Sequence, residues 1–238
     1  MMVVTKSIQQ DYLLALRALR MAHVPFVIGG AWALEHYIRL GRATLDLDLM
    51  IEPSQLDPAV HALAEAGARL LDQDATQNRM CLHDAEVDLV HHFAQGAYAI
   101  DASWILRGRP ARIFDSAASI AAPEDLLWTK MFVAARHRFD GADVVHLMRA
   151  TGKTLDWDLL NEHLEPYPEL LLAYLHLFQY IYPSDWNLVP TRIMDDLMAG
   201  FAAPSEPSST RICRGTLIDR SSFVYDIVSG GYEDAGES

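Results

Sequence analysis

Hydrophobic and polar residues alternate most regularly between residues 45 and 49, where the sequence reads LDLDL. Successive side chains of an extended strand point to opposite faces of its sheet. The pattern therefore predicts a strand with Leu45, Leu47 and Leu49 in a core and with Asp46 and Asp48 together on the other face. Aspartate is uncommon in strands, and like charges on one face repel. The acidic face therefore indicates either a bound cation or the solvated side of an amphipathic strand.

The first half of the chain mixes helical patterns with short apolar runs. Apolar residues three or four positions apart predict helices over residues 7–21, 31–40 and 56–66. Short apolar or alternating runs predict strands over residues 26–28, 79–83, 85–91 and 109–114. The segment 99–106 fits neither pattern clearly.

From residue 123 onward the pattern becomes helical. Pro123 followed by Glu124 and Asp125 is typical of a helix N-terminus, and we expect this helix to continue through Lys130 to about residue 134. Further helices are predicted over about 140–150, 156–164, 167–182 and 190–201. The patterns together predict an α/β (α+β) domain with a small mixed sheet over residues 1–120, a helical domain over 121–202, and a linker with a C-terminal tail over 203–238.

The composition limits the partners and the location. The chain has 238 residues, of which 19 are basic and 32 acidic, so its formal net charge is −13. This charge disfavours bulk DNA binding and anionic lipid surfaces. The two cysteines are far apart and indicate neither a disulfide scaffold nor a cysteine-based zinc site. Because no apolar segment is long enough for a membrane span and no signal-peptide pattern is present, we expect a cytoplasmic protein without a membrane partner.

Two further features lie near the acidic strand in the predicted order of elements. Gly29 and Gly30 separate a short apolar run from a helix, an arrangement that allows a phosphate to approach the backbone at a helix N-terminus. An ordinary tight turn is the equally simple alternative. Asp88 lies on the strand predicted over 85–91 and supplies a third acid. By itself Asp88 would be a surface residue, and only the combination with the other two features points to a site.

This combination resembles the signature of the nucleotidyltransferase fold superfamily. The matching residues are Gly29-Gly30, Arg42-x-Thr44, Asp46-x-Asp48 and Asp88. The chain is similar to the bacterial branch that includes abortive-infection type nucleotidyltransferases, closely over residues 26–51 and more loosely through residues 130–143. The resemblance implies that the three aspartates bind Mg²⁺ or Mn²⁺ and act in catalysis, and that the two glycines approach the triphosphate of a nucleotide.

The resemblance also implies nucleotide contacts for three other side chains. Arg42 and Thr44 precede the acidic strand and can donate hydrogen bonds to phosphate oxygens, although pairing with neighbouring acids is an alternative. Lys130 matches a basic position in a helical stretch of the family, and the alternative is an ordinary salt-bridged helix face.

The function expected from these residues is a metal-dependent nucleotidyltransferase that moves an NMP group from an NTP to an acceptor and releases pyrophosphate. The acceptor stays open between a small molecule, a protein and RNA. The alternative is a catalytically weak or inactive nucleotide-binding or interaction protein of the same fold. A minor alternative is a zinc or iron hydrolase that uses His83, His91 or His92 with Asp88; His91 and His92 are expected to face oppositely.

Overall fold

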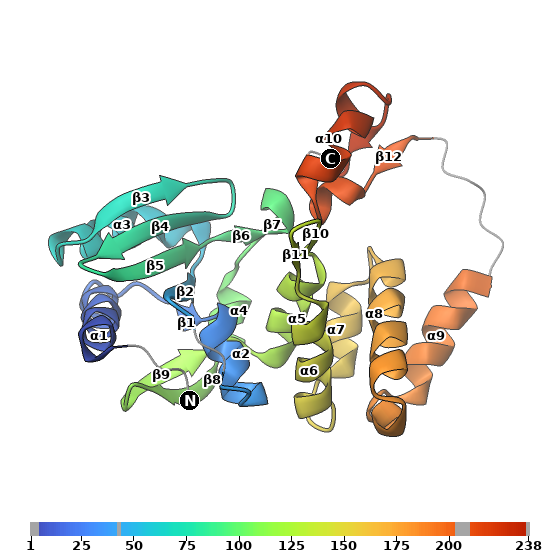
Figure 1. Cartoon of the computed structure of the whole chain (residues 1–238), viewed down its shortest axis with the longest axis horizontal. Coiled ribbons are helices and arrows are strands. Elements are labelled where there is room, and N and C mark those ends of the chain that lie inside the picture. The colour runs from blue at the N-terminus through green and yellow to red at the C-terminus, as the bar shows by residue number, and fades with distance from the viewer. Residues whose placement is uncertain (1–4, 42–43, 203–209, 237–238) are drawn as a thin grey trace. The chain divides into compact units, whose positions relative to one another are not determined.

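The computed structural model describes residues 5–41, 44–202 and 210–236 (Figure 1). The chain folds into two compact units, one ending at Ala122 and the other beginning at Pro123. No helix within the described residues is long and apolar enough to cross a membrane.

The N-terminal unit is built on a mixed sheet of seven strands in the order β3-β4-β5-β2-β1-β9-β8. Its strands are β1 (Val27–Ile28), β2 (Asp46–Met50), β3 (Arg69–Gln73), β4 (Gln77–Leu82), β5 (Ala85–Val90), β8 (Arg109–Ile113) and β9 (Ser116–Ile120). The pairs β2–β5 and β1–β9 are parallel, and the other neighbours are antiparallel. A separate small pair joins β6 (His92–Phe93) to β7 (Tyr98–Ala99).

The helices of this unit are α1 (Lys6–Met21), α2 (Gly30–Ile38), α3 (Leu56–Glu65) and α4 (Ala102–Arg107). Helices α1 and α3 contact each other and strands of the β3–β4–β5 region, whereas α2 contacts β2 (Figure 1). The apolar face of α1 is fully buried at Tyr12, Leu16 and Leu19. The spacing of these residues is the reason why the sequence predicts this helix.

The prediction for the acidic strand needs one correction. Leu47 and Leu49 are completely buried, as predicted, but Leu45 is 67% exposed. Strand β2 begins only at Asp46, so Leu45 precedes the pleated segment whose alternation would turn its side chain inward. The sequence also missed strands β3 and β9. All five residues of β3 are exposed, so this edge strand has no buried face to recognise.

Three aromatic side chains fix the start of β2. Tyr12, Trp32 and Phe114 form a cluster with ring centroids 4.7 to 6.2 Å apart. The Tyr12 hydroxyl donates to the carbonyl of Leu45 at 2.6 Å, and the Trp32 indole N–H donates to the carbonyl of Asp46 at 3.0 Å. Burial and the nearby carboxylates raise the pKa of Tyr12, so the hydroxyl keeps its proton as a donor. Helices α1 and α2 are thereby tied to the backbone that carries the acidic residues.

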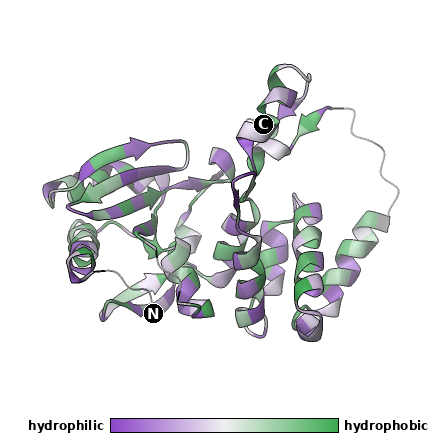
Figure 2. Ribbon diagram, viewed as in Figure 1, coloured by the Kyte–Doolittle hydropathy of each residue, from purple (hydrophilic) through white to green (hydrophobic). Residues whose placement is uncertain are grey.

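The C-terminal unit is mainly helical. Its long helices are α5 (Pro123–Met131), α6 (Gly141–Thr151), α7 (Trp157–His163), α8 (Pro168–Ile181) and α9 (Thr191–Ala202). Helix α5 packs on α6 and α7, and α8 packs on α6 and α9. The helix expected to continue to about residue 134 ends at Met131 instead. A short hairpin of β10 (Ala134–Ala135) and β11 (Arg138–Phe139) follows, and Figure 2 shows its hydrophilic residues in purple.

Residues 210–236 form a small folded segment within this unit. Strands β12 (Ile212–Cys213) and β13 (Glu233–Asp234) pair in parallel and flank α10 (Arg220–Val228). Asp219 caps α10 and accepts a hydrogen bond from the backbone N–H of Arg136 at 3.1 Å. The segment is thereby attached to the β10–β11 hairpin. The rest of the predicted linker, residues 203–209, lies outside the described residues.

The hydroxyl of Tyr12 provides a test of the tie between α1 and the acidic strand. We expect Tyr12→Phe to lower the free energy of unfolding by about 1–2 kcal/mol, because the carbonyl of Leu45 loses its donor at a fully buried side chain. Chemical denaturation measures this change. Tyr225→Phe is the matched control, since the Tyr225 side chain is 72% exposed. An equal effect of the two substitutions would contradict the assigned role of Tyr12.

Candidate active site

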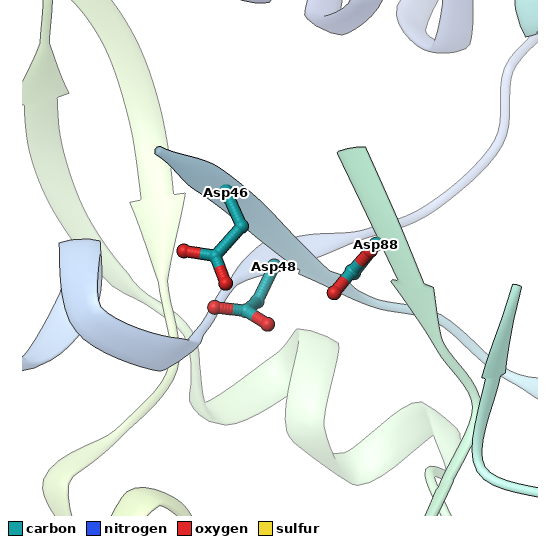
Figure 3. A group of neighbouring side chains, drawn as sticks. All are labelled: Asp46, Asp48 and Asp88. Atoms are coloured by element: carbon teal, nitrogen blue, oxygen red, sulfur yellow. The ribbon is translucent and has the colours of Figure 1, made fainter. Parts of the chain in front are cut away.

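The acidic residues of β2 and β5 share one face of the sheet. The two strands are parallel, and their register places Asp46 beside Glu86 and Asp48 beside Asp88. Asp46, Asp48 and Asp88 each offer an oxygen atom, and these atoms all lie within 4.8 Å of one another (Figure 3). The structure thus brings together three residues that the sequence separates by up to 42 positions (88 − 46).

The chemistry of this group fits a hard divalent cation. Carboxylate oxygens are the ligands that Mg²⁺ and Mn²⁺ prefer, and a magnesium site needs only a few of them because the ion keeps several waters. No second group of three such ligands occurs in residues 5–41, 44–202 and 210–236. Asp88 faces the other two aspartates, which is the orientation that a complete acidic triad requires.

Glu86 is a fourth acid on this face that sequence analysis did not single out. It lies opposite Asp46 and two positions before Asp88, so it shares the face of Asp88. Its side chain is 46% exposed and lies 3.8 Å from the guanidinium of Arg79. The same alternation that identified Asp46 and Asp48 could have identified Glu86 in the segment EVD.

Asp88 is almost completely buried, with 2% of the residue exposed, and Arg79 is its main partner. The Arg79 Nε and Nη2 atoms donate to Oδ1 and Oδ2 of Asp88 at 2.8 and 2.9 Å, and Gln77 Nε2 donates to Oδ2 at 3.2 Å. The hydrogen bonds and charge of Asp88 raise the pKa of the Arg79 guanidinium. The planar guanidinium of Arg79 therefore binds the carboxylate through two hydrogen bonds, which fix the orientation of the carboxylate.

The position of Arg79 follows from the hairpin that joins β4 and β5. Residues 82 and 85 pair across the turn at His83 and Asp84, which places Arg79 opposite Asp88. Arg79 is not among the site residues predicted from the sequence. Counting residue pairs outward from the turn between the two predicted strands is the signal that places it opposite Asp88.

Gly30 leaves room for the carboxylate of Asp48. A Cβ atom at Gly30 would lie 1.6 Å from Asp48 Oδ2, and the residue has a φ of +50°. Both facts require glycine there. At Gly29 a Cβ would meet the flexible end of Met50 instead, at 2.3 Å. The Gly29 N–H donates to the carbonyl of Asp48 at 2.9 Å, so helix α2 begins directly beside the acidic strand.

Arg42 and Thr44, the two polar residues before β2, were predicted to contact a phosphate. The Thr44 hydroxyl donates to Oδ1 of Asp46, so it contacts a neighbouring acid and orients that carboxylate. Arg42 lies outside the described residues. Nucleotide contacts by either side chain remain predictions.

Lys130 lies in the C-terminal unit and is buried. Its Nζ atom is 2.9 Å from Asp140 Oδ2 and 2.7 Å from Asp143 Oδ2, and 9% of its side chain is exposed. Burial opposes ionisation of Asp140, but hydrogen bonds from Arg138 and the charge of Lys130 outweigh it and lower the pKa of Asp140. Lys130 therefore neutralises two carboxylates of its own unit, and its contact with a nucleotide remains a prediction.

The three histidines considered for a zinc or iron site lie in two separate arrangements. His83 Nδ1 lies 2.9 Å from Oδ1 of Asp11, a residue of helix α1. His91 and His92 were expected to face oppositely, but their Nδ1 atoms are only 2.7 Å apart. The expectation is wrong because β5 ends at Val90 and His92 begins β6, so a single continuous strand does not carry both residues.

The room at Gly30 generates a second testable outcome. We expect Gly30→Ala to lower the free energy of unfolding by about 1–3 kcal/mol, because the new Cβ displaces the Asp48 carboxylate and strains a positive φ. Gly200→Ala is the matched control in α9, where a Cβ meets nothing within 4 Å. Denaturation curves that shift equally for both variants would refute the close fit of Gly30 against Asp48.

The buried charge of Lys130 leads to a third testable prediction. We expect Lys130→Met to lower the free energy of unfolding by about 3 kcal/mol or more, since Asp140 and Asp143 lose their shared cation in a buried place. Tryptophan fluorescence during urea unfolding follows this change. Lys153→Met, at an exposed lysine, should be close to neutral. A stable Lys130→Met variant would show that the cluster does not need its lysine.

Residues 8–180 match the sequence profile of a family described as uncharacterised nucleotidyltransferases. A search of curated proteins found no significant match.

Several solved structures align with the chain. The solution structure of the antibiotic-resistance factor ANT(2'')-Ia aligns with a TM-score of 0.50 and 15% identity, covering 74% of this chain and 100% of that one. The lincomycin-bound lincosamide antibiotic adenylyltransferase LnuA aligns with a TM-score of 0.44 and 13% identity, covering 62% of this chain and 99% of that one. JHP933 from Helicobacter pylori aligns over 96% of both chains with 15% identity and a TM-score of 0.40.

Proposed function

The chain belongs to a family of uncharacterised nucleotidyltransferases, and we propose on this premise that it transfers an NMP group from an NTP to an acceptor and releases pyrophosphate. The observation that carries the proposal is the convergence of Asp46, Asp48 and Asp88 on one face of β2 and β5. Three carboxylates from two paired strands form a donor set that suits Mg²⁺ or Mn²⁺. We assign the metal ligands and the catalytic role to these three residues.

The reaction moves charge between oxygen atoms. An oxygen of the acceptor attacks the α-phosphorus, the bond from that phosphorus to the bridging oxygen of the β-phosphate breaks, and the hydroxyl proton passes to a base. A divalent cation bound by Asp46, Asp48 and Asp88 would neutralise negative charge on the attacking and leaving oxygens. The contribution of the chain is to keep its three carboxylates in fixed positions before the nucleotide arrives.

The nucleotide contacts are proposed for residues around the N-terminus of α2 and for Lys130. Gly29 and Gly30 lie at the start of helix α2, and the N–H groups of a helix N-terminus favour a phosphate. Arg42 and Thr44 are assigned on the family pattern, and in the sequence they directly precede the acidic strand β2. Lys130 is assigned on its match to the family pattern, although its present partners are Asp140 and Asp143.

The acceptor is a hydroxyl or phosphate group on a small molecule, a protein or RNA. The net charge of −13 disfavours a large nucleic acid, because a polyanion is repelled by an acidic surface. A short RNA end bound by a local basic patch is compatible with this charge. Fractionation of a labelled cell extract separates the three classes.

The test incubates the protein with each α-³²P-labelled NTP, Mg²⁺ or Mn²⁺ and a cell extract, and it measures label in RNA, protein and small-molecule fractions. We expect transfer by the wild type and a loss of at least about a hundredfold in Asp46→Asn and in Asp48→Asn, because a neutral amide is a poor ligand for a hard cation. Asp84→Asn is the matched control, since Asp84 is an exposed acid in the β4–β5 turn. It should transfer label at the wild-type rate.

Two results would contradict the proposal in different ways. Transfer that persists in both aspartate variants would exclude the assigned metal ligands. A lack of transfer from every NTP, with NTP binding retained, would favour the non-catalytic nucleotide-binding protein.

A further inference from the structure

Arg79 occupies most of the hydrogen-bonding capacity of Asp88. An ionised carboxylate has about four lone-pair positions, two on each oxygen. Arg79 Nη2 and Gln77 Nε2 both donate to Oδ2 of Asp88, whereas among the described residues Oδ1 receives only Arg79 Nε. Three of the positions are therefore filled by protein donors, and the remaining one is on Oδ1.

The position of the guanidinium is set by the strand register and by a second acid. Arg79 lies opposite Asp88 in the β4–β5 register, so the backbone places the two side chains together. Its Nε atom is also 3.8 Å from Glu86 Oε2, which adds a second negative group beside it. The Arg79 side chain is 37% exposed while that of Asp88 is 2% exposed, so the positive charge lies at the outer edge of a buried carboxylate.

From this geometry we infer that Arg79 is a positioning residue of the proposed metal site: it presents Asp88 to the cation through Oδ1 alone and offsets part of the acidic charge that attracts the cation. The inference rests on the proposed function. It gives the guanidinium two separable effects. Its fork fixes the carboxylate for transfer, and its charge weakens cation binding by repulsion.

The two effects predict changes of opposite sign in one variant. Arg79→Gln removes a positive charge, so we expect the affinity of the protein for Mn²⁺ alone to rise about fivefold or more. The same variant frees Asp88 to rotate, so NMP transfer should fall at least about tenfold. Arg79→Lys keeps the charge but loses the planar guanidinium. Its Mn²⁺ affinity should therefore stay within about twofold of the wild type, while NMP transfer falls at least about tenfold, as in Arg79→Gln.

The experiment titrates Mn²⁺ into the full chain without nucleotide and follows free Mn²⁺ by electron paramagnetic resonance. Arg69→Gln is the matched control, because Arg69 is an exposed arginine on the neighbouring strand β3. It should leave Mn²⁺ affinity and transfer unchanged. Mn²⁺ binding that weakens or stays the same in Arg79→Gln would overturn the inference, since a purely structural role predicts no gain in affinity.

Two further arms keep the result interpretable. If Arg79→Gln does not fold, as judged by circular dichroism, Arg79→Lys decides alone: wild-type Mn²⁺ affinity with reduced transfer supports the inference, and wild-type transfer overturns it. Asp46→Asn tests the metal site itself, because it should abolish Mn²⁺ binding. Unchanged binding in Asp46→Asn would refute the proposed metal site, whereas a failure confined to the Arg79 variants would refute only this inference.

Discussion

The parallel register between β2 and β5 is the constraint on which the candidate site depends. A slip of one residue would move every side chain of β2 to the other face of the sheet. Leu47, Leu49, Val87 and Leu89 are at most 1% exposed, and burying each of them contributes about 1.5–3 kcal/mol. Two like charges 4 Å apart near a protein surface repel by about 4 kcal/mol, which is less than these four buried side chains contribute together. The apolar face therefore decides the register, and the acidic face follows from it.

This balance explains which parts of the site could be predicted from the sequence. Alternation of leucine and aspartate is a local pattern, so it predicted the shared face of Asp46 and Asp48. The addition of Asp88 came from the family resemblance, because periodicity alone does not say that β5 pairs with β2. Counting residue pairs outward from the turn at His83 and Asp84 is enough to place Arg79 opposite Asp88. Gly30 was recognised as a turn residue, but its close approach to Asp48 depends on contacts that no local pattern encodes.

Among the helices and strands too, some follow from a local sequence pattern and others depend on contacts with residues elsewhere in the chain. Helices α1 and α3 have clear apolar faces, and their ranges were predicted to within a few residues. Strand β9, with the sequence SAASI, has small residues of low strand propensity and is held by pairing with β1 and β8. The helix through Lys130 was predicted to extend to about residue 134, because alanine has a high helix propensity and residues 134 and 135 are alanines. Their pairing with Arg138 and Phe139 overrides that local preference.

The molecule stabilises its clustered acids in two different ways. Around Lys130 the cation is part of the chain: one lysine is within 3 Å of two carboxylates, and all three side chains are nearly buried. In the strand site, the backbone itself is fixed at each aspartate of β2, because Asp46 and Asp48 accept hydrogen bonds through their carbonyls from Trp32 and Gly29. Fixing the backbone constrains where the carboxylates of Asp46 and Asp48 lie, whereas Asp88 is oriented by Arg79. An exchangeable cation needs such a site, since the ligands must keep their places when the ion leaves.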